Sequence, residues 1–147
     1  MKRSTAIEPL FVDTWGWLVL ANDRDPAFAA VAALRRQYAE SAGLWVTTDY
    51  VLDETITRLF MTTPFRHADA FCKAIFESQK AGVLGIEPIH PERFEEAYRL
   101  RLRYRDKPRI SYTDLTSFIV MRELGIHQVL SADAHFSQVG LGFHQVP

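Results

Sequence analysis

The sequence predicts an α/β fold in which helices cover both faces of a mostly parallel sheet. Short apolar runs alternate with longer stretches of helical periodicity along the chain, and this alternation is typical of successive strand–helix–strand units. Right-handed crossovers between parallel strands then place helices on both faces of the sheet. Proline and glycine mark the helix ends, because proline fits the first turn and glycine tolerates the left-handed residue after the last. Helical stretches begin at Pro26, Pro64 and Pro91 and are followed by Gly43, Gly82 and Gly125.

Each element can be assigned in order. The strands are expected at the short apolar runs Leu10–Asp13, Leu44–Thr47, Val83–Ile89, Gln128–Ser131 and Phe143–Val146. The helices are expected at the longer periodic stretches Trp15–Ala21, Pro26–Ala42, Tyr50–Met61, Pro64–Ala81, Pro91–Arg105 and Thr113–Leu124, with a short helical turn at Ala134–Val139. No repeat or linker interrupts the 147 residues, so we expect one domain over residues 1–147.

Composition excludes several classes of protein. Seventeen basic and 18 acidic side chains give a net charge of -1, which argues against a globally basic nucleic-acid binder but allows a local basic patch. One cysteine, Cys72, excludes an internal disulfide framework and a cysteine-rich zinc site. Glu8 and Asp13 interrupt any signal-peptide core, and the apolar stretch Trp15–Ala21 is too short to cross a bilayer. We therefore expect a cytoplasmic protein with no membrane partner.

Acidic side chains fall where the predicted strands end and the following helices begin. Asp13 and Asp133 end two strands, Asp114 lies in the first turn of a helix, and Glu54 lies in the helix after the second strand. Ligands of such sheets bind beyond the carboxyl ends of the strands, so the four carboxylates are expected at one edge. Carboxylates in a cluster repel one another, and a hard divalent cation such as Mg²⁺ or Mn²⁺ relieves that repulsion. Phosphodiester hydrolysis is the usual chemistry of such a site.

Each acid also has a local interpretation. Asp13 is suited to cap the following helix, and Asp114 follows Ser111 at the spacing of a capping box. Glu54 is placed to pair with Arg58, four residues on, and Asp133 is an acceptable turn residue. These interpretations do not explain why all four acids map to one edge. A glycine-rich dinucleotide motif and a Walker A motif are both missing from the sequence.

At these residues the chain resembles the PIN-domain family, and within it the ribonuclease toxins of bacterial and archaeal toxin–antitoxin pairs. Four ordered segments carry the resemblance over nearly the whole chain: residues 11–14 (FVDT), 53–59 (DETITRL), 106–118 (DKPRISYTDLTSF) and 130–136 (LSADAHF). The resemblance implies a three-layer α/β/α sandwich around about five mostly parallel strands. It also implies a metal-dependent endoribonuclease that uses Mg²⁺ or Mn²⁺.

The resemblance also assigns roles. The catalytic acids that it implies are Asp13, Glu54, Asp114 and Asp133. The metal ligands among them are Asp13, Asp114 and Asp133. Asp133 and Glu54 contact the metal either directly or through water. Thr113 or Ser111 orients metal-bound water. The metal lowers the pKa of that water for in-line attack, which leaves a 5′-phosphate and a 3′-hydroxyl. Some relatives carry a further acid two residues after the last aspartate, where this chain has His135; that histidine either contacts phosphate or has a structural role.

Six basic residues fall within eleven positions before the third acid, with tyrosines between them. They are Arg99, Arg101, Arg103, Arg105, Lys107 and Arg109. Either they attract an RNA backbone, with Arg105, Lys107 and Arg109 as the candidate contacts, or their stems cover apolar surface. Successive alternate positions point to different sides of a helix, so only some of them can face one ligand.

The resemblance implies partners as well as a substrate. Toxins of this family form homodimers and are wrapped by a cognate antitoxin protein. The stripe Trp15, Trp17, Leu18, Leu20 and Phe28, or the helix at 56–60, is either core or part of such an interface. The alternative function is a housekeeping or non-catalytic PIN-like module that binds RNA or protein, and the intact set of four acids favours the enzyme.

Overall fold

A five-stranded sheet, parallel throughout, forms the centre of the molecule. The computed structural model describes residues 6–147; residues 1–5, which belong to the expected domain, lie outside the described residues. The strands are β1 (Leu10–Val12), β2 (Trp45–Thr48), β3 (Leu84–Glu87), β4 (Gln128–Leu130) and β5 (His144–Val146), in the spatial order β3-β2-β1-β4-β5. This arrangement confirms the prediction of a mostly parallel sheet of about five strands.

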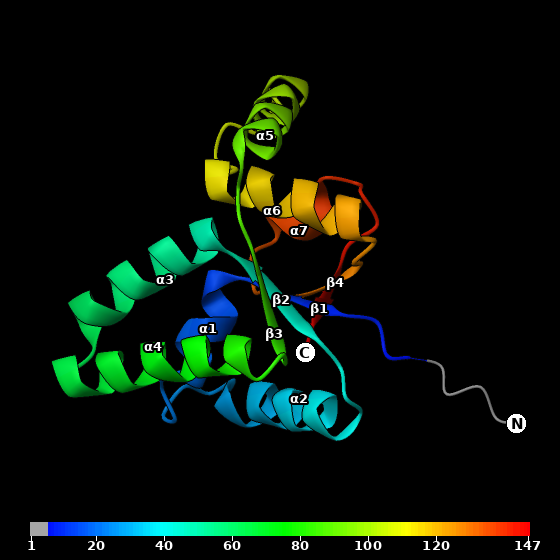
Figure 1. The fold of residues 1–147 in the computed structure, drawn as a ribbon. Helices are drawn as coiled ribbons and strands as arrows, with labels where there is room; N and C mark the ends of the chain where they lie inside the picture. Colours follow the sequence, from blue (N-terminus) through cyan, green and yellow to red (C-terminus); the bar gives the residue numbers. More distant parts are fainter. Residues whose placement is uncertain (1–5) are drawn as a thin grey trace, which may run out of the picture.

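Helices occupy the connections between the strands. They are α1 (Thr14–Leu20), α2 (Phe28–Glu40), α3 (Asp49–Thr62), α4 (Phe65–Lys80), α5 (Pro91–Arg103), α6 (Tyr112–Leu124) and α7 (His135–Gln138). From β1 the chain adds β2 and then β3 on one side of β1. It then crosses back over the sheet and adds β4 and β5 on the other side of β1. Because the crossovers are right-handed, α1–α4 lie on one face of the sheet and α5–α7 on the other. Figure 1 shows α5 and α6 together, well apart from α2 and α4. Each expected element is present, with ends that differ by no more than two residues.

The core forms because central parallel strands are covered on both faces. Leu10, Phe11 and Val12 of β1 are fully buried, as continuous apolar strands of a parallel sheet should be. Trp17 of α1 packs edge-on against Trp45 of β2, with ring centroids 5.9 Å apart. Trp17 is therefore a core residue, as its default interpretation predicted. The free Cys72 is also buried, in a small cluster with Leu59 and Ala68.

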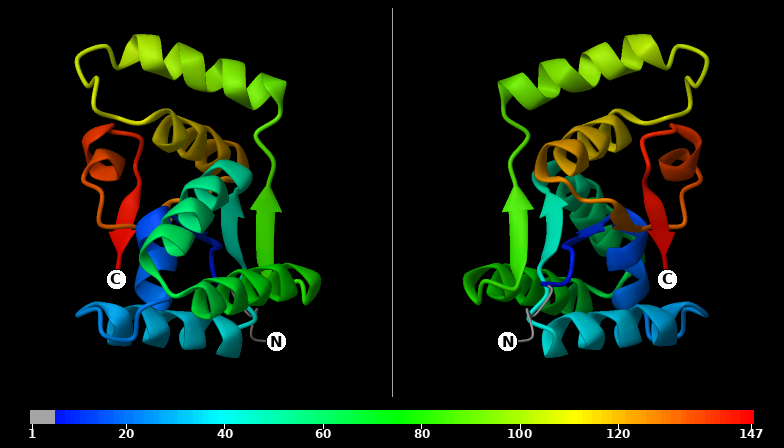
Figure 2. Two further views of the ribbon diagram at one scale, coloured as in Figure 1. Left: turned by 90° about the vertical axis from the view of Figure 1, so that its left-hand side faces the viewer. Right: turned by 90° about the vertical axis from the view of Figure 1, so that its right-hand side faces the viewer.

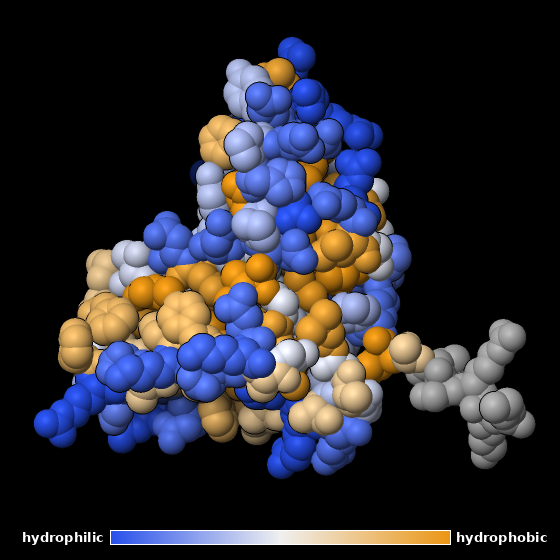
Figure 3. Space-filling view, viewed as in Figure 1, coloured by the Kyte–Doolittle hydropathy of each residue, from blue (hydrophilic) through white to orange (hydrophobic). Residues whose placement is uncertain are grey.

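A buried arginine holds α5 against the rest of the fold. Arg93, with 7% of its side chain exposed, bonds Glu87 at the end of β3 at 2.9 Å and Glu123 of α6 at 2.8 Å. The side views show α5 beyond the carboxyl ends of β2 and β3, with α2 at the opposite end of the sheet (Figure 2). The surface over α5 is largely hydrophilic, whereas apolar side chains gather over α3 and α4 (Figure 3).

Candidate active site

Four predicted acids line one pocket at the carboxyl ends of the strands. Asp13 follows β1, Asp133 follows β4, Glu54 lies on α3 and Asp114 lies in the first turn of α6. The pocket has a volume of about 340 Å³ and is lined by these acids and by Thr14, Trp15, Arg58, Arg109, Ser111, Ala132 and His135. It opens beside β1 and β4, where the direction of the strand order reverses, which is the usual ligand site of an open α/β sheet.

The inner two acids are buried. Asp13 is 6% exposed and Asp114 is 7% exposed. Burial raises the pKa of Asp13 to about 6, against the lowering effect of a hydrogen bond that Ser131 Oγ donates to Asp13 Oδ2 at 2.8 Å. Burial also raises the pKa of Asp114, and burial together with the charges of Asp13 and Asp133 brings it to about 7. A cation bound beside these two carboxyl groups therefore stabilises their ionised forms.

The outer two acids are more exposed and also make the local contacts expected of them. The Glu54 side chain is 44% exposed; it accepts a hydrogen bond from Thr14 Oγ1 at 3.1 Å and pairs with Arg58 at 3.7 Å. Asp133 Oδ1 accepts a hydrogen bond from the backbone N–H of His135 at 2.9 Å, as in an Asx turn. Both acids also line the pocket. For these two residues, the local contact and a role in the site are therefore compatible.

The local interpretation fails for Asp13. Within residues 6–147 its side chain makes no capping hydrogen bond to α1. Its carboxylate is instead bonded across the sheet to Ser131, whose hydroxyl also accepts a hydrogen bond from the backbone N–H of Asp133 at 3.0 Å. Ser131 thus couples the loop after β1 to the loop after β4. The sequence analysis did not single out this serine.

His135 completes a cluster of possible metal ligands. One ligand atom from each of Asp114, Asp133 and His135 lies within 4.8 Å of the others. The expected metal set was Asp13, Asp114 and Asp133; in the structure Asp13 lies outside this three-residue cluster but lines the same pocket. Oxygen donors beside one imidazole fit a divalent cation such as Mg²⁺ or Mn²⁺.

Some of the residues predicted to orient water or to contact RNA line the pocket, and others do not. Ser111 lines it while its hydroxyl caps α6 by accepting from the backbone N–H of Asp114 at 3.0 Å. Thr113 is half-buried in the same turn and lies outside the pocket lining. Arg109 lines the pocket, whereas Arg105 is exposed after α5 and Lys107 pairs with Asp106 at 2.8 Å. Of the three candidate RNA contacts, only Arg109 faces the acids.

Arg101 has a structural role in the basic segment. Its guanidinium donates to the carbonyl oxygens of Tyr104, Lys107 and Ile110 at 2.6–2.7 Å. These bonds fix the loop between α5 and α6 and so set the position of Ser111 and Asp114 at the start of α6. The sequence could not distinguish this arginine from its neighbours, because its partners are backbone atoms.

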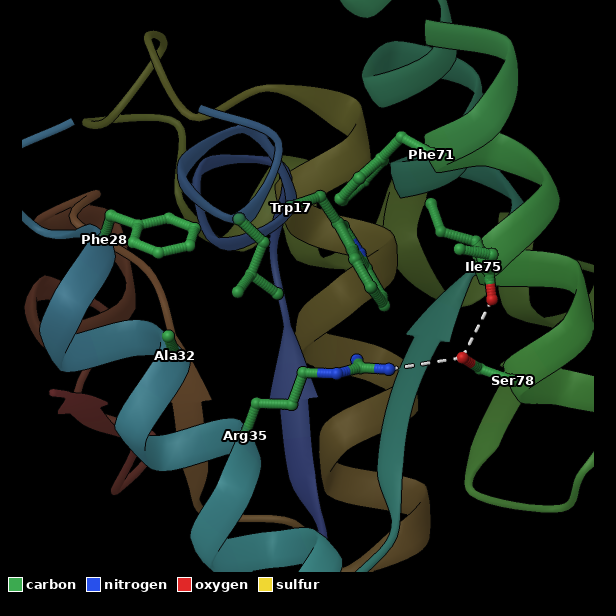
Figure 4. A pocket seen from close by; sticks show the side chains of 9 residues that line it. Trp17, Phe28, Ala32, Arg35, Phe71, Ile75 and Ser78 are labelled. Atoms are coloured by element: carbon green, nitrogen blue, oxygen red, sulfur yellow. Dashed lines mark hydrogen bonds between the residues drawn. The ribbon is translucent and has the colours of Figure 1, made fainter. Parts of the chain in front are cut away.

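A second, apolar groove lies between α1, α2 and α4. It has a volume of about 310 Å³ and is lined mainly by Trp17, Leu20, Phe28, Phe71 and Ile75. Figure 4 shows Trp17, Phe28, Phe71 and Ile75 around the groove, with Arg35 reaching across it to donate a hydrogen bond to Ser78 at 3.3 Å. Part of the aromatic stripe noted in the sequence is therefore accessible in a groove.

Comparison with known proteins identifies the family. The family model of the PIN domain matches residues 10–141, which is most of the chain. The chain belongs to the PIN-domain family. The 23S rRNA-specific endonuclease VapC20 of Mycobacterium tuberculosis, strains CDC 1551 and H37Rv, is 31% identical to this PIN domain over 131 residues, which are 89% of this chain and 94% of the relative.

Solved structures agree with this assignment. The crystal structure of Mycobacterium tuberculosis VapC20, described as a toxin that cleaves the sarcin–ricin loop, has a TM-score of 0.76 and 30% identity, and the match covers 93% of this PIN domain and 98% of that chain. VapBC2 from Rickettsia felis, bound to promoter DNA, has a TM-score of 0.71 at 13% identity with the same coverage, and supports the fold alone. Across the described part of the chain, none of the helices has the length and apolar character needed to span a bilayer.

Proposed function

We propose that this PIN domain is a metal-dependent endoribonuclease and the toxin of a toxin–antitoxin pair. The observation that carries the proposal is the convergence of four carboxylates from four separate elements in one pocket, with two of them buried. The identity to VapC20 extends over nearly the full length of both chains and supports RNA as the substrate. The same identity makes the sarcin–ricin loop of 23S rRNA the first substrate to test.

The four acids have different roles in the site. A divalent ion bound there supplies an activated water and stabilises the leaving oxygen. Asp13, Asp114 and Asp133 hold the ion, and Glu54 completes its surroundings directly or through water. Ser131 orients Asp13 through its 2.8 Å hydrogen bond, and Ser111 holds the turn that carries Asp114. Arg109 is placed to bond a phosphate of the RNA strand as it enters the pocket.

The test is cleavage of a sarcin–ricin-loop RNA by purified protein with Mg²⁺, Mn²⁺ or EDTA. We expect cleavage with either ion, none with EDTA, and a loss of about 10³-fold in Asp13→Asn. Asp53→Asn is the matched control, because Asp53 is an exposed aspartate next to Glu54 on α3, and it should keep full activity. Cleavage that persists in EDTA and in Asp13→Asn contradicts the proposal.

The apolar groove supports the assignment of a protein partner. A groove lined by Trp17, Phe28 and Phe71 suits an amphipathic segment of a cognate antitoxin, as helix-in-groove recognition requires. A second apolar surface lies at the corner between α3 and α4, where Phe60, Met61 and Phe65 are exposed. We assign this surface to a homodimer contact. We expect an activity on RNA that is controlled by an antitoxin to act in the cytoplasm.

The alternative is a housekeeping or non-catalytic PIN-like module. Such a module has no need to keep two carboxyls buried at a cost to its own stability. The raised pKa values of Asp13 and Asp114 therefore favour the enzyme.

A further inference from the structure

The imidazole of His135 lies between two of the acids. Its Nδ1 is 3.1 Å from Asp133 Oδ1 and 3.3 Å from Asp114 Oδ2. Nδ1 carries at most one proton, so it can donate to only one of these two carboxylates at a time. The side chain is 25% exposed and lines the pocket, and its ring is therefore accessible to a bound ion.

The distances from Nδ1 to the two carboxylate oxygens match the separation between neighbouring ligands of one octahedral ion. Ligands at right angles, each about 2.1 Å from the ion, lie about 3.0 Å apart. The two distances from Nδ1, 3.1 and 3.3 Å, are close to that separation. An ion bound through Nδ1 requires the ring proton to be on Nε2.

The backbone holds this ring in place. The N–H of His135 donates to Asp133 Oδ1 at 2.9 Å, so the histidine and the aspartate form one turn. The next residue, Phe136, is fully buried and packs edge-on against Phe118 of α6, with ring centroids 5.0 Å apart. Because Phe136 anchors the turn to the helix that carries Asp114, the imidazole and that carboxylate keep their relative positions.

We propose that His135 Nδ1 is a metal ligand of this site and that it shifts the preference of the site from Mg²⁺ toward Mn²⁺. The inference rests on the proposed function, since it concerns the ion of that same pocket. Mg²⁺ prefers an all-oxygen shell, whereas transition-metal ions accept imidazole nitrogen readily. A donor set that adds an imidazole to the carboxylates therefore favours Mn²⁺ more than a set of carboxylates alone does.

The experiment loads the RNA-free protein with Mn²⁺ and measures ¹⁴N coupling by pulsed electron paramagnetic resonance, alongside calorimetric titrations with Mn²⁺ and Mg²⁺. We expect ¹⁴N coupling of an imidazole in the parent protein and its loss in His135→Ala, with Mn²⁺ affinity about tenfold lower. His135→Asp restores an oxygen donor and should lower the ratio of Mn²⁺ to Mg²⁺ affinity by about tenfold. His144→Ala is the matched control, because His144 is exposed at the start of β5, at the opposite end of the sheet.

The outcomes separate this inference from the proposed function. Divalent binding without ¹⁴N coupling, or coupling that survives His135→Ala, overturns the role of His135 and leaves the nuclease proposal standing. Unchanged Mn²⁺ affinity in His135→Ala together with a raised KM for RNA also overturns it, because the histidine then contacts phosphate. No divalent binding by the parent protein overturns both proposals.

Discussion

Replacing Asp114 by asparagine should abolish RNA cleavage and at the same time stabilise the metal-free protein. The carboxyl of Asp114 is buried near Asp13 and Asp133, and this environment raises its pKa to about 7. Asparagine keeps the shape and one acceptor oxygen but removes the charge. We expect cleavage to fall by about 10³-fold or more and the free energy of unfolding in EDTA at pH 8 to rise by about 1–2 kcal/mol.

The two effects are measured by RNA cleavage with Mn²⁺ and by urea unfolding with EDTA. Asp53→Asn removes the same charge from an exposed position on α3, and both quantities should stay close to the parent values. A destabilised Asp114→Asn protein, or one that keeps a tenth of the parent activity, contradicts the role given to this acid.

The stability of the metal-free protein should fall as the pH rises from about 4 to about 7. Burial raises the pKa of Asp13 to about 6 and that of Asp114 to about 7, above their ordinary value of 3.8. In this window the folded state holds more protons than the unfolded state, so raising the pH favours unfolding. The loss should amount to several kcal/mol across the window.

A bound ion should reverse that trend, because it binds the ionised carboxylates and its affinity rises with pH. Urea unfolding at pH 5, 6, 7 and 8, with EDTA and then with saturating Mn²⁺, measures both curves. The double variant Asp13→Asn/Asp114→Asn should flatten the EDTA curve. Metal-free stability that rises steadily between pH 5 and pH 7 contradicts the account.

The position of the acidic site could be predicted from the sequence because it follows from topology. Asp13 comes directly after β1 and Asp133 lies in the loop after β4, and parallel strands bring their carboxyl ends to one edge. Asp114 is placed by the start of α6, which Ser111 marks as a cap. Each of these signals lies in a short stretch of sequence, and the parallel topology of the sheet brings the marked acids close together in space.

The contacts that hold the site could not be predicted in the same way. The hydrogen bond from Ser131 to Asp13 joins residues 118 positions apart, and serine after a strand has no distinctive pattern. Arg93 and Arg101 resemble any other arginines on α5, yet one is buried between two glutamates and the other binds three carbonyl oxygens. Which residue of the basic segment 99–109 lines the pocket depends on the path of the loop after α5, and within that segment Arg109 is the one that does.

The chemistry of the RNA ends tests the central claim most directly, namely that the acidic pocket directs a metal-activated water onto the phosphodiester. The account predicts products with a 5′-phosphate and a 3′-hydroxyl, formed only with a divalent ion and not by Asp13→Asn or Asp114→Asn. Products with a 2′,3′-cyclic phosphate would show that the ribose 2′-hydroxyl is the nucleophile, and cleavage in EDTA would show that no divalent ion is needed; either result would contradict the claim.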